Sequence, residues 1–199
     1  MDDDSEIIDA ILEGASDRYG ELVDRYQLAA WKLAYSFVGN FEDAKDLSQN
    51  GFVKAYQNLG RFRGGSRFST WLYRIIANEC KDFLRRKNRR PFFVSLSAPD
   101  EPEEGASPAI PFELEDRGNN PRETAQDREL AAQLAGAMER LPMKQRTAFL
   151  LRHVNGLSLE ETSEAMGCRL GTVKSHLFRA SESLRAFLGP FLTSQETPR

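Results

Sequence analysis

Residues 158–185 read SLEETSEAMGCRLGTVKSHLFRASESLR, and this stretch decides the fold of the C-terminal part of the chain. Ser158 and Glu161 have the S-x-x-E spacing of a capping box, which opens a helix by pairing its first free backbone N–H groups. Gly167 is expected to end that helix, because glycine tolerates the left-handed backbone of a helix end. A further helix is expected from about residue 170. Two short helices joined by a turn of about three or four residues predict a helix-turn-helix.

The second of these helices is expected to be amphipathic. Its apolar residues step by three and four along the chain, and they are Leu170, Val173, Leu177, Ala180 and Leu184. The opposite face carries Lys174, Ser175, Phe178, Arg179 and Glu182. Basic side chains on such a helix can contact guanine edges or phosphates in the major groove, and Phe178 can contact a thymine methyl. The alternative is an ordinary amphipathic helix with a solvated basic face and Phe178 in the core.

The charges are strongly segregated along the 199 residues, although the net charge is only -3. Residues 61–90 hold ten basic and two acidic residues. In contrast, residues 1–17 hold seven acidic residues and no basic one, and residues 98–121 hold seven acidic residues and one basic residue. Binding to a polyanion depends on the local field rather than on the total charge, so the basic block predicts a nucleic-acid partner.

Composition and motifs exclude several classes of protein. No apolar run approaches the ~18 residues needed to cross a membrane, and the N-terminus MDDDSEIIDA is acidic where a signal peptide is basic. Cys80 and Cys168 are the only cysteines, which excludes a disulfide scaffold and a cysteine-rich zinc site. His153 and His176 lack partners at metal-ligand spacing. We therefore expect a cytoplasmic protein with no membrane insertion, no metal, no cofactor and no catalytic residues.

The chain is predicted to be all-α, with two small helical domains joined by a flexible acidic linker. In the first domain we expect a helix from an N-cap at Asp17 to a stop at Gly39, a helix at 42–59, a basic loop RFRGGSR at 61–67 and a helix at 68–89. In the second domain we expect helices near 121–140, 143–155, 159–166 and 170–188. The domain boundaries follow as 1–17 (acidic segment), 18–92, 93–121 (linker), 122–189 and 190–199 (tail).

The helix at 68–89 carries a polar stripe opposite its apolar residues. The stripe consists of Thr70, Arg74, Asn78, Lys81 and Arg85. Trp71 and Tyr73 flank it, and a cationic stripe with aromatic neighbours suits single-stranded or opened DNA. The alternative places Phe68 and Trp71 in the core and leaves the basic residues solvated.

Two long stretches resemble one known family. Residues 42–90 (EDAKDLSQNGFVKAYQNLGRFRGGSRFSTWLYRIIANECKDFLRRKNRR) resemble the second conserved region of sigma-70 factors, and residues 141–185, beginning LPMKQRTAFLLRHVNG, resemble the fourth. With only a short acidic linker between them, the chain is similar to the extracytoplasmic-function (ECF) group. The resemblance implies a bacterial sigma factor that binds core RNA polymerase and directs promoter-specific transcription initiation.

The resemblance also implies roles for individual residues. Those expected to recognise and melt the minus-10 element are Arg61, Arg63, Trp71, Arg74, Asn78 and Lys81, with Asn78 at the position that holds a flipped-out base. Those expected to read the minus-35 element are Arg169, Thr172, Lys174, Ser175, Phe178 and Arg179. Those expected to bind polymerase are Asp43, Asp46, Gln49 and Asn50. The implied partners are core RNA polymerase, promoter DNA as duplex and as melted non-template strand, and an anti-sigma factor, with the free protein a monomer.

Some residues depart from the family pattern. Gly51 lies inside a predicted helix, where it costs ~1 kcal/mol relative to alanine and indicates a kink or close packing. Thr162 and Ser163 replace an apolar and small pair in the first helix of the helix-turn-helix. His176 replaces a position that is often basic, which predicts a weaker or pH-dependent phosphate contact.

Two other functions fit part of the sequence. A stand-alone helix-turn-helix regulator would bind duplex DNA tightly without polymerase and would not open it. A sequestering protein, such as an anti-sigma module, would bind polymerase or a regulator without needing its basic residues. The basic and aromatic helix at 68–89 favours the sigma factor over both, because neither alternative needs it. The acidic segment at the N-terminus is a candidate shield for the basic stripe.

Overall fold

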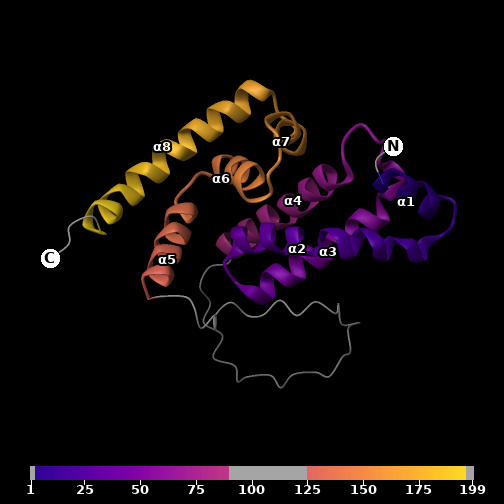
Figure 1. Cartoon of the computed structure of the whole chain (residues 1–199), viewed down its shortest axis with the longest axis horizontal. Coiled ribbons are helices and arrows are strands. Elements are labelled where there is room, and N and C mark those ends of the chain that lie inside the picture. The colour runs from indigo at the N-terminus through magenta and orange to yellow at the C-terminus, as the bar shows by residue number, and fades with distance from the viewer. Residues whose placement is uncertain (1–2, 90–124, 196–199) are drawn as a thin grey trace, which may run out of the picture.

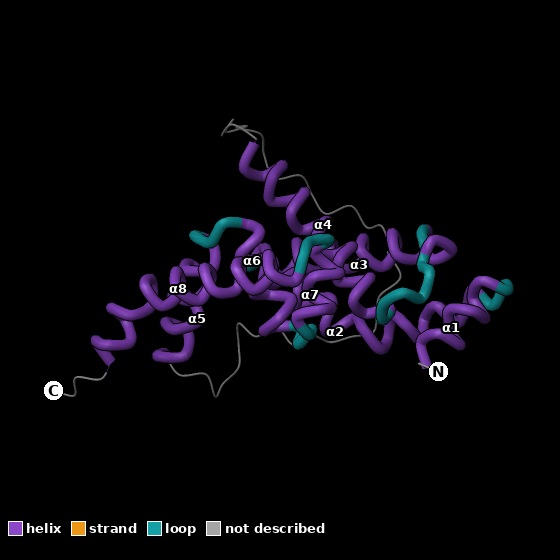
Figure 2. Tube along the Cα trace, turned by 90° about the horizontal axis from the view of Figure 1, so that it is seen from above, coloured by secondary structure: helices purple, strands orange, loops and turns teal. Residues whose placement is uncertain are grey.

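A computed structural model describes residues 3–89 and 125–195, and all regular secondary structure within these ranges is helical (Figures 1 and 2). The N-terminal lobe contains α1 (Asp3–Leu12), η1 (Ser16–Arg18), α2 (Tyr19–Val38), α3 (Phe41–Gln57), η2 (Leu59–Arg61) and α4 (Phe68–Arg89). The C-terminal lobe contains α5 (Ala125–Glu139), α6 (Met143–Phe149), the π-helical turn η4 (Leu150–Val154), α7 (Leu159–Met166) and α8 (Leu170–Gln195). The all-α prediction is confirmed, whereas the predicted linker at 93–121 lies outside the described residues.

The N-terminal lobe is built on three helices, α2, α3 and α4, that pack against one another. Their apolar faces meet in the core of the lobe, where Leu33, Phe37 and Leu72 are fully buried. Gly39 ends α2 as predicted, with a φ of 67° and its N–H bonded to the Tyr35 carbonyl. The side chain of Asn40 then caps α3 by accepting a hydrogen bond of 2.9 Å from the Asp43 N–H. This tight connection sets α3 antiparallel to α2.

The N-terminal helix α1 was not predicted from the sequence. It buries Ile7, Ile8 and Ile11 against the N-terminal lobe, with exposed fractions of only 1%, 4% and 8%. Asp4 is buried with them, and its carboxylate accepts hydrogen bonds from the Arg25 guanidinium and the Tyr26 hydroxyl. The acidic segment is therefore part of the folded lobe, with its isoleucines turned inward.

The predicted N-cap of α2, Asp17, is wrong. Asp17 lies in the 3₁₀ turn η1, and α2 begins two residues later at Tyr19, with Arg18 in the cap position and no side-chain cap. Asp17 cannot act as the N-cap because it lies inside the turn η1. The backbone is already helical at Arg18, so α2 follows the turn without a side-chain cap.

Gly51 marks a close contact between α3 and α4. An ideal Cβ built on Gly51 would lie 2.5 Å from Cγ1 of Ile76, a fully buried residue of α4. The two helix backbones approach closely here because glycine leaves room for the isoleucine. Of the two predicted explanations for Gly51, close packing is the one that the structure confirms.

Replacing Gly51 with alanine is therefore expected to destabilise the protein, although alanine is the better helix former. The added methyl group must displace Ile76, and overpacking of this kind costs about 1–3 kcal/mol. Chemical denaturation measures the effect. The double variant Gly51→Ala/Ile76→Ala should lose less unfolding free energy than the two single variants lose in sum. A more stable Gly51→Ala variant would contradict the contact.

The C-terminal lobe contains the predicted helix-turn-helix, formed by α7 and α8. Ser158 and Glu161 form the capping box, with bonds of 3.0 Å and 2.7 Å, and Gly167 ends α7 with a φ of 61°. Thr162 is fully buried, and its hydroxyl donates to the Ser158 carbonyl at 2.7 Å. The hydroxyl of Ser163 donates to the Cys168 carbonyl at 2.5 Å. Both polar residues therefore fit the helix, because each hydroxyl finds a backbone acceptor.

Two helix boundaries in this lobe differ from the predictions. The helix predicted at 143–155 changes to π-helical geometry at Leu150, and the Asn155 N–H bonds to the Leu150 carbonyl five residues back. Helix α8 continues to Gln195, beyond the expected end at 188. The lobes also touch: α7 packs on α4, and η4 packs on α2 (Figure 1).

Candidate nucleic-acid interface

A pocket on the N-terminal lobe brings together three of the six predicted minus-10 residues. Its volume is about 290 Å³, and it is lined by Lys54, Asn58, Arg61, Trp71, Ile75, Asn78 and Glu79. The aromatic and apolar side chains offer a stacking surface, whereas the amides and cations offer hydrogen-bond donors. Such a mixture suits an unpaired base attached to a phosphate backbone.

Packing among aromatic side chains fixes one wall of this pocket. The ring of Trp71 lies 5.3 Å from Phe62 and 5.9 Å from Phe68, centroid to centroid. Phe68 is buried, as the alternative interpretation expected, but Trp71 keeps part of its surface exposed in the pocket. Tyr73, predicted to flank the stripe together with Trp71, is instead a core residue with 5% of its surface exposed, whereas a DNA contact of Trp71 stays a prediction.

Three polar pocket residues were missed by sequence reasoning: Lys54, Asn58 and Glu79. The Lys54 ammonium lies 2.5 Å from the Glu79 carboxylate, which ties α3 to α4 across the pocket. Lys54 and Glu79 are 25 positions apart in the chain, so only the packing of α3 on α4 brings them together. No local spacing in the sequence signals this pair.

The remaining predicted minus-10 residues lie in different surroundings. Arg63 and Arg74 are exposed, and Lys81 is half-buried in a groove of about 770 Å³ with Asn78, Arg85 and Lys144. Burial lowers the pKa of Lys81 from its usual value, and the nearby Arg74 lowers it further. Thr70 is an error in the predicted stripe: it is buried, because its position faces the lobe's core.

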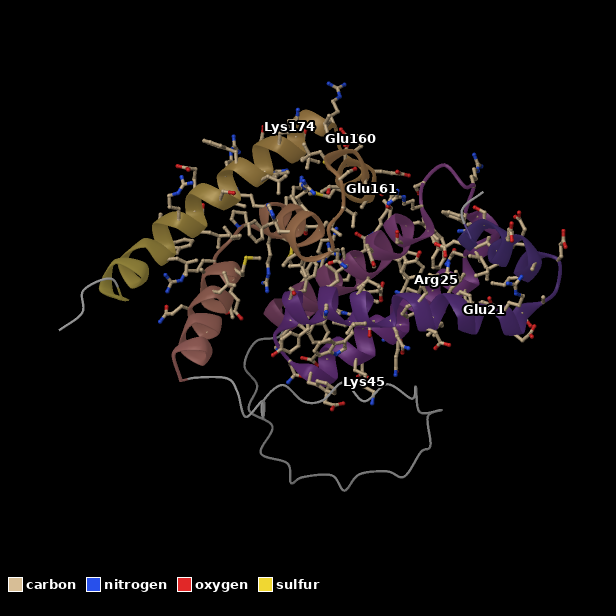
Figure 3. The ribbon with its side chains drawn as sticks, in the orientation of Figure 1. Glu21, Arg25, Lys45, Glu160, Glu161 and Lys174 are labelled. Carbon is tan, nitrogen blue, oxygen red and sulfur yellow. The ribbon has the colours of Figure 1, made fainter. Side chains whose placement is uncertain are left out.

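The predicted minus-35 residues gather at the N-terminal end of α8. All six are exposed, and they are Arg169, Thr172, Lys174, Ser175, Phe178 and Arg179. Phe178 has 68% of its surface in solvent, so the alternative that placed it in the core is wrong. Figure 3 shows Lys174 on the outer edge of the C-terminal lobe, close to the start of α7. An exposed basic face around an exposed phenyl ring is what major-groove contact requires.

The predicted polymerase-binding residues all lie on α3, where Asp43, Asp46 and Asn50 follow the three- and four-residue spacing of one helix face. Asp46 and Asn50 are exposed and Gln49 is half-buried. Asp43 lies 3.9 Å from the Lys87 ammonium of α4. Exposed Val53 continues the outer face one turn beyond Asn50, and no polar pattern in the sequence singles it out.

His176 lies on α8, near the charges of Lys144 and Arg179. Burial lowers the pKa of His176 below its usual value, and the charges of Lys144 and Arg179 lower it further. Its Nδ1 atom is buried without a hydrogen-bond partner. Both influences favour the neutral form of the imidazole.

Neither cysteine forms a disulfide, and burial raises the pKa of the Cys80 thiol to about 12. Cys80 is thus an inert packing residue. Across residues 3–89 and 125–195, no three His, Cys, Asp or Glu side chains gather as metal ligands, and no helix is long and apolar enough to span a membrane.

Fold and surface together define a helical protein with two lobes, one carrying a helix-turn-helix and the other a basic and aromatic pocket. Two family models match: Sigma-70 region 2 at residues 22–90 and Sigma-70, region 4 at residues 131–184. The chain belongs to the sigma-70 family of RNA polymerase sigma factors, in its ECF group.

Curated relatives match over nearly their whole length. The RNA polymerase sigma-H factor of Pseudomonas aeruginosa is 36% identical over 196 residues, covering 96% of this chain and 97% of the relative. The ECF RNA polymerase sigma-E factor of Escherichia coli is 35% identical over 189 residues, covering 95% and 96%. The family assignment therefore applies to the whole chain.

Solved structures share the fold. CnrH in complex with the cytosolic domain of CnrY has a TM-score of 0.66 at 23% identity, covering 92% of this chain and 96% of that one. The sigma factor RpoE in complex with the anti-sigma factor NepR from Bartonella quintana has a TM-score of 0.56 at 24% identity, covering 85% and 97%.

Proposed function

We propose that this protein is a sigma factor that binds core RNA polymerase in the bacterial cytoplasm and directs initiation at promoters with its own minus-35 and minus-10 sequences. Each predicted domain has its own role in this proposal. Residues 18–92 bind polymerase and melt the minus-10 element, and residues 122–189 bind the minus-35 element. The observation that carries the proposal is the pocket on α3 and α4, because a regulator that reads only duplex DNA has no use for it.

The proposed mechanism is non-catalytic and needs no ATP. A base flipped out of the minus-10 duplex would stack on Trp71 and accept or donate hydrogen bonds at Asn78, while Arg61 meets the backbone. Stacking contributes about 1–3 kcal/mol per base, which offsets an unstacking cost of a few kcal/mol per step. The opened strand is thereby stabilised by binding alone.

The C-terminal lobe would fix the complex on the duplex. Lys174 and Arg179 provide charge for guanine edges or phosphates, and Phe178 provides apolar contact for a thymine methyl. Because both lobes are in one chain, binding of one lobe to its promoter element raises the effective concentration of the other lobe at the second element. Sequence specificity then depends on both promoter elements together.

The proposed protein partners are core RNA polymerase and an anti-sigma factor. The candidate polymerase surface consists of Asp43, Asp46, Gln49 and Asn50, and Val53 extends it. The solved structures of similar fold are complexes with CnrY and with the anti-sigma factor NepR, which supports a partner of this kind here.

Run-off transcription tests the proposed function. Core polymerase would be supplied with this protein and a library of promoters from its own genome, and selective initiation is expected. A variant with alanine at Arg74, Asn78 and Lys174 should lose it. Duplex binding without polymerase binding or initiation would instead identify a stand-alone regulator.

His176 makes minus-35 binding pH-dependent if the proposal is correct. A DNA phosphate would counter the charges of Lys144 and Arg179 and raise the histidine pKa in the complex above that in the free protein. Binding then takes up a proton, so affinity should rise several-fold as the pH falls from about 7.5 to about 5.5. Fluorescence anisotropy with a minus-35 duplex measures this.

Two variants serve as controls for the pH effect. His176→Gln should flatten the pH dependence, whereas His176→Arg should flatten it and bind more tightly at neutral pH. An unchanged pH slope in His176→Gln would assign the proton uptake to another group.

A further inference from the structure

A second pocket has no role in the proposed function. Its volume is about 440 Å³, and residues of α2, α5, α6 and η4 line it. Among the described residues that line it, none is predicted to contact DNA or polymerase. Small-molecule sites in proteins have volumes of about 300–1,000 Å³ and are mostly apolar with a few well-placed polar groups. The pocket has the size of such a site.

The walls of this pocket are mainly apolar and partly in contact with solvent. Tyr35 of α2, Leu134 of α5 and Val154 of η4 line it, with 42%, 44% and 44% of their surfaces exposed. A ligand that covers these side chains removes apolar surface from water, which is favourable. Leu150 and Val154 belong to the π-helical turn, and such turns occur frequently at functional sites. The walls therefore suit the apolar body of a small molecule.

Arg146 of α6 supplies a buried positive charge. It lines the pocket with only 7% of its surface exposed. Its Nη2 donates to the carbonyls of Ser36 and Phe37, in the last turn of α2, at 3.0 Å and 2.7 Å. Its Nε atom is buried without a hydrogen-bond partner, and within residues 3–89 and 125–195 no carboxylate forms an ion pair with the guanidinium. The two carbonyls thus occupy only part of the donor capacity of Arg146.

A buried cation of this kind favours an anionic ligand group. Carbonyls at a helix end carry only partial negative charge, so they stabilise the guanidinium without neutralising it. Burial lowers the pKa of Arg146 from its usual value, and the charge of Glu139 counters this. Glu139 also lines the pocket, but it is exposed to solvent. A carboxylate matches the free donors of a guanidinium with charge-assisted hydrogen bonds.

We propose that this pocket binds a small aliphatic monocarboxylic acid, with its hydrocarbon chain against the apolar walls and its carboxylate hydrogen-bonded to Arg146. Binding is non-covalent and involves no reaction. The inference goes beyond the proposed function and does not depend on it, because the free protein binds the acid without polymerase or DNA.

Calorimetric titration of the full chain with octanoate tests the proposal. We expect one site per chain with a dissociation constant on the order of 100 μM. Octanol has the same hydrocarbon chain without the charge, and it should bind about tenfold or more weakly. Equal binding of octanoate and octanol, or the absence of saturable octanoate binding, would overturn the proposal.

Substitution of Glu139 by glutamine changes the charge that an anionic ligand meets in the pocket. Glu139→Gln is expected to strengthen octanoate binding about two- to fivefold and to leave octanol binding unchanged. Glu160→Gln on α7 is the matched control, since Glu160 is an exposed carboxylate that is not among the lining residues, and it should change neither affinity. An unchanged octanoate affinity in Glu139→Gln would contradict a carboxylate bound in this pocket.

Substitution of Arg146 tests the proposed carboxylate partner directly. Arg146→Met keeps an apolar stem and removes the donors, so octanoate should bind about tenfold or more weakly while octanol binding is retained. Circular dichroism identifies a variant that fails to fold, in which case the Glu139→Gln and Glu160→Gln pair decides. A folded Arg146→Met variant with full octanoate affinity would overturn the proposal.

Methyl NMR spectra of methionine-labelled protein locate the ligand. Met138 lines the pocket, whereas Met166 of α7 does not. Octanoate should shift the Met138 methyl signal in proportion to site occupancy and leave the Met166 signal in place. A shift of Met166 without one of Met138 would place the ligand elsewhere and refute the proposal. Failure of the protein to support initiation with core polymerase would refute the proposed function but would leave these binding results unchanged.

Discussion

Alanine at Asn78 is expected to reduce promoter opening roughly 5- to 150-fold while leaving polymerase binding unchanged. Asn78 lies on α4 in the pocket with Arg61 and Trp71, and its amide can both donate to and accept from a base edge. Loss of such contacts to a base costs about 1–3 kcal/mol, which gives this range of rates. The rate is measured by permanganate reactivity of the opened strand in complexes of known composition.

A matched control separates the pocket from general damage to the helices. Gln57 is an exposed amide at the end of α3 and is not among the pocket's lining residues. Gln57→Ala should open promoters at the normal rate. If Asn78→Ala weakened polymerase binding as much as it slowed opening, the residue would belong to a different surface.

Deletion of residues 1–13 is expected to destabilise the N-terminal lobe by about 5 kcal/mol or more. The deletion removes Ile7, Ile8 and Ile11, and burial of each isoleucine contributes about 1.5–3 kcal/mol. It also removes the buried carboxylate of Asp4, which leaves the Arg25 and Tyr26 donors without it. Since a domain is typically stable by only 5–15 kcal/mol, thermal unfolding should occur far earlier or without cooperativity.

A charge variant separates this structural role from electrostatic shielding. Glu6, Asp9 and Glu13 are exposed on or directly after α1, and neutral amides at all three should leave the unfolding temperature nearly unchanged. Non-specific DNA binding at low salt in that variant then tests the shield alone. A deletion variant as stable as the full chain would show that α1 is dispensable.

Much of the fold follows from local sequence patterns. The apolar spacing in α2 and α4, the capping box at Ser158 and the helix stops at Gly39 and Gly167 act over a few residues, so each could be recognised without tertiary information. The exposed face of α8 was predicted on the same basis. The identities of the DNA- and polymerase-binding residues remain predictions.

Features that depend on distant contacts could not be predicted in this way. Helix α1 is rich in acids, and its isoleucines become a core face only because the N-terminal lobe is there to receive them. The Lys54–Glu79 pair and the Arg146 contacts join residues 25 and more than 100 positions apart. Thr70 was misplaced because a polar residue at the edge of a stripe can equally face the core.

The close approach at Gly51 has a mechanical consequence. Helix α3 carries the candidate polymerase surface on its outer face and contributes Lys54 and Asn58 to the pocket. With Ile76 seated against Gly51, α3 cannot approach α4 more closely, and a displacement of α3 towards α4 is expected to move both helices together. If polymerase docks on α3 as proposed, a shift of α3 is expected also to move the pocket residues that α3 contributes. Adaptation of this chain to a different polymerase would therefore also retune which promoters it opens.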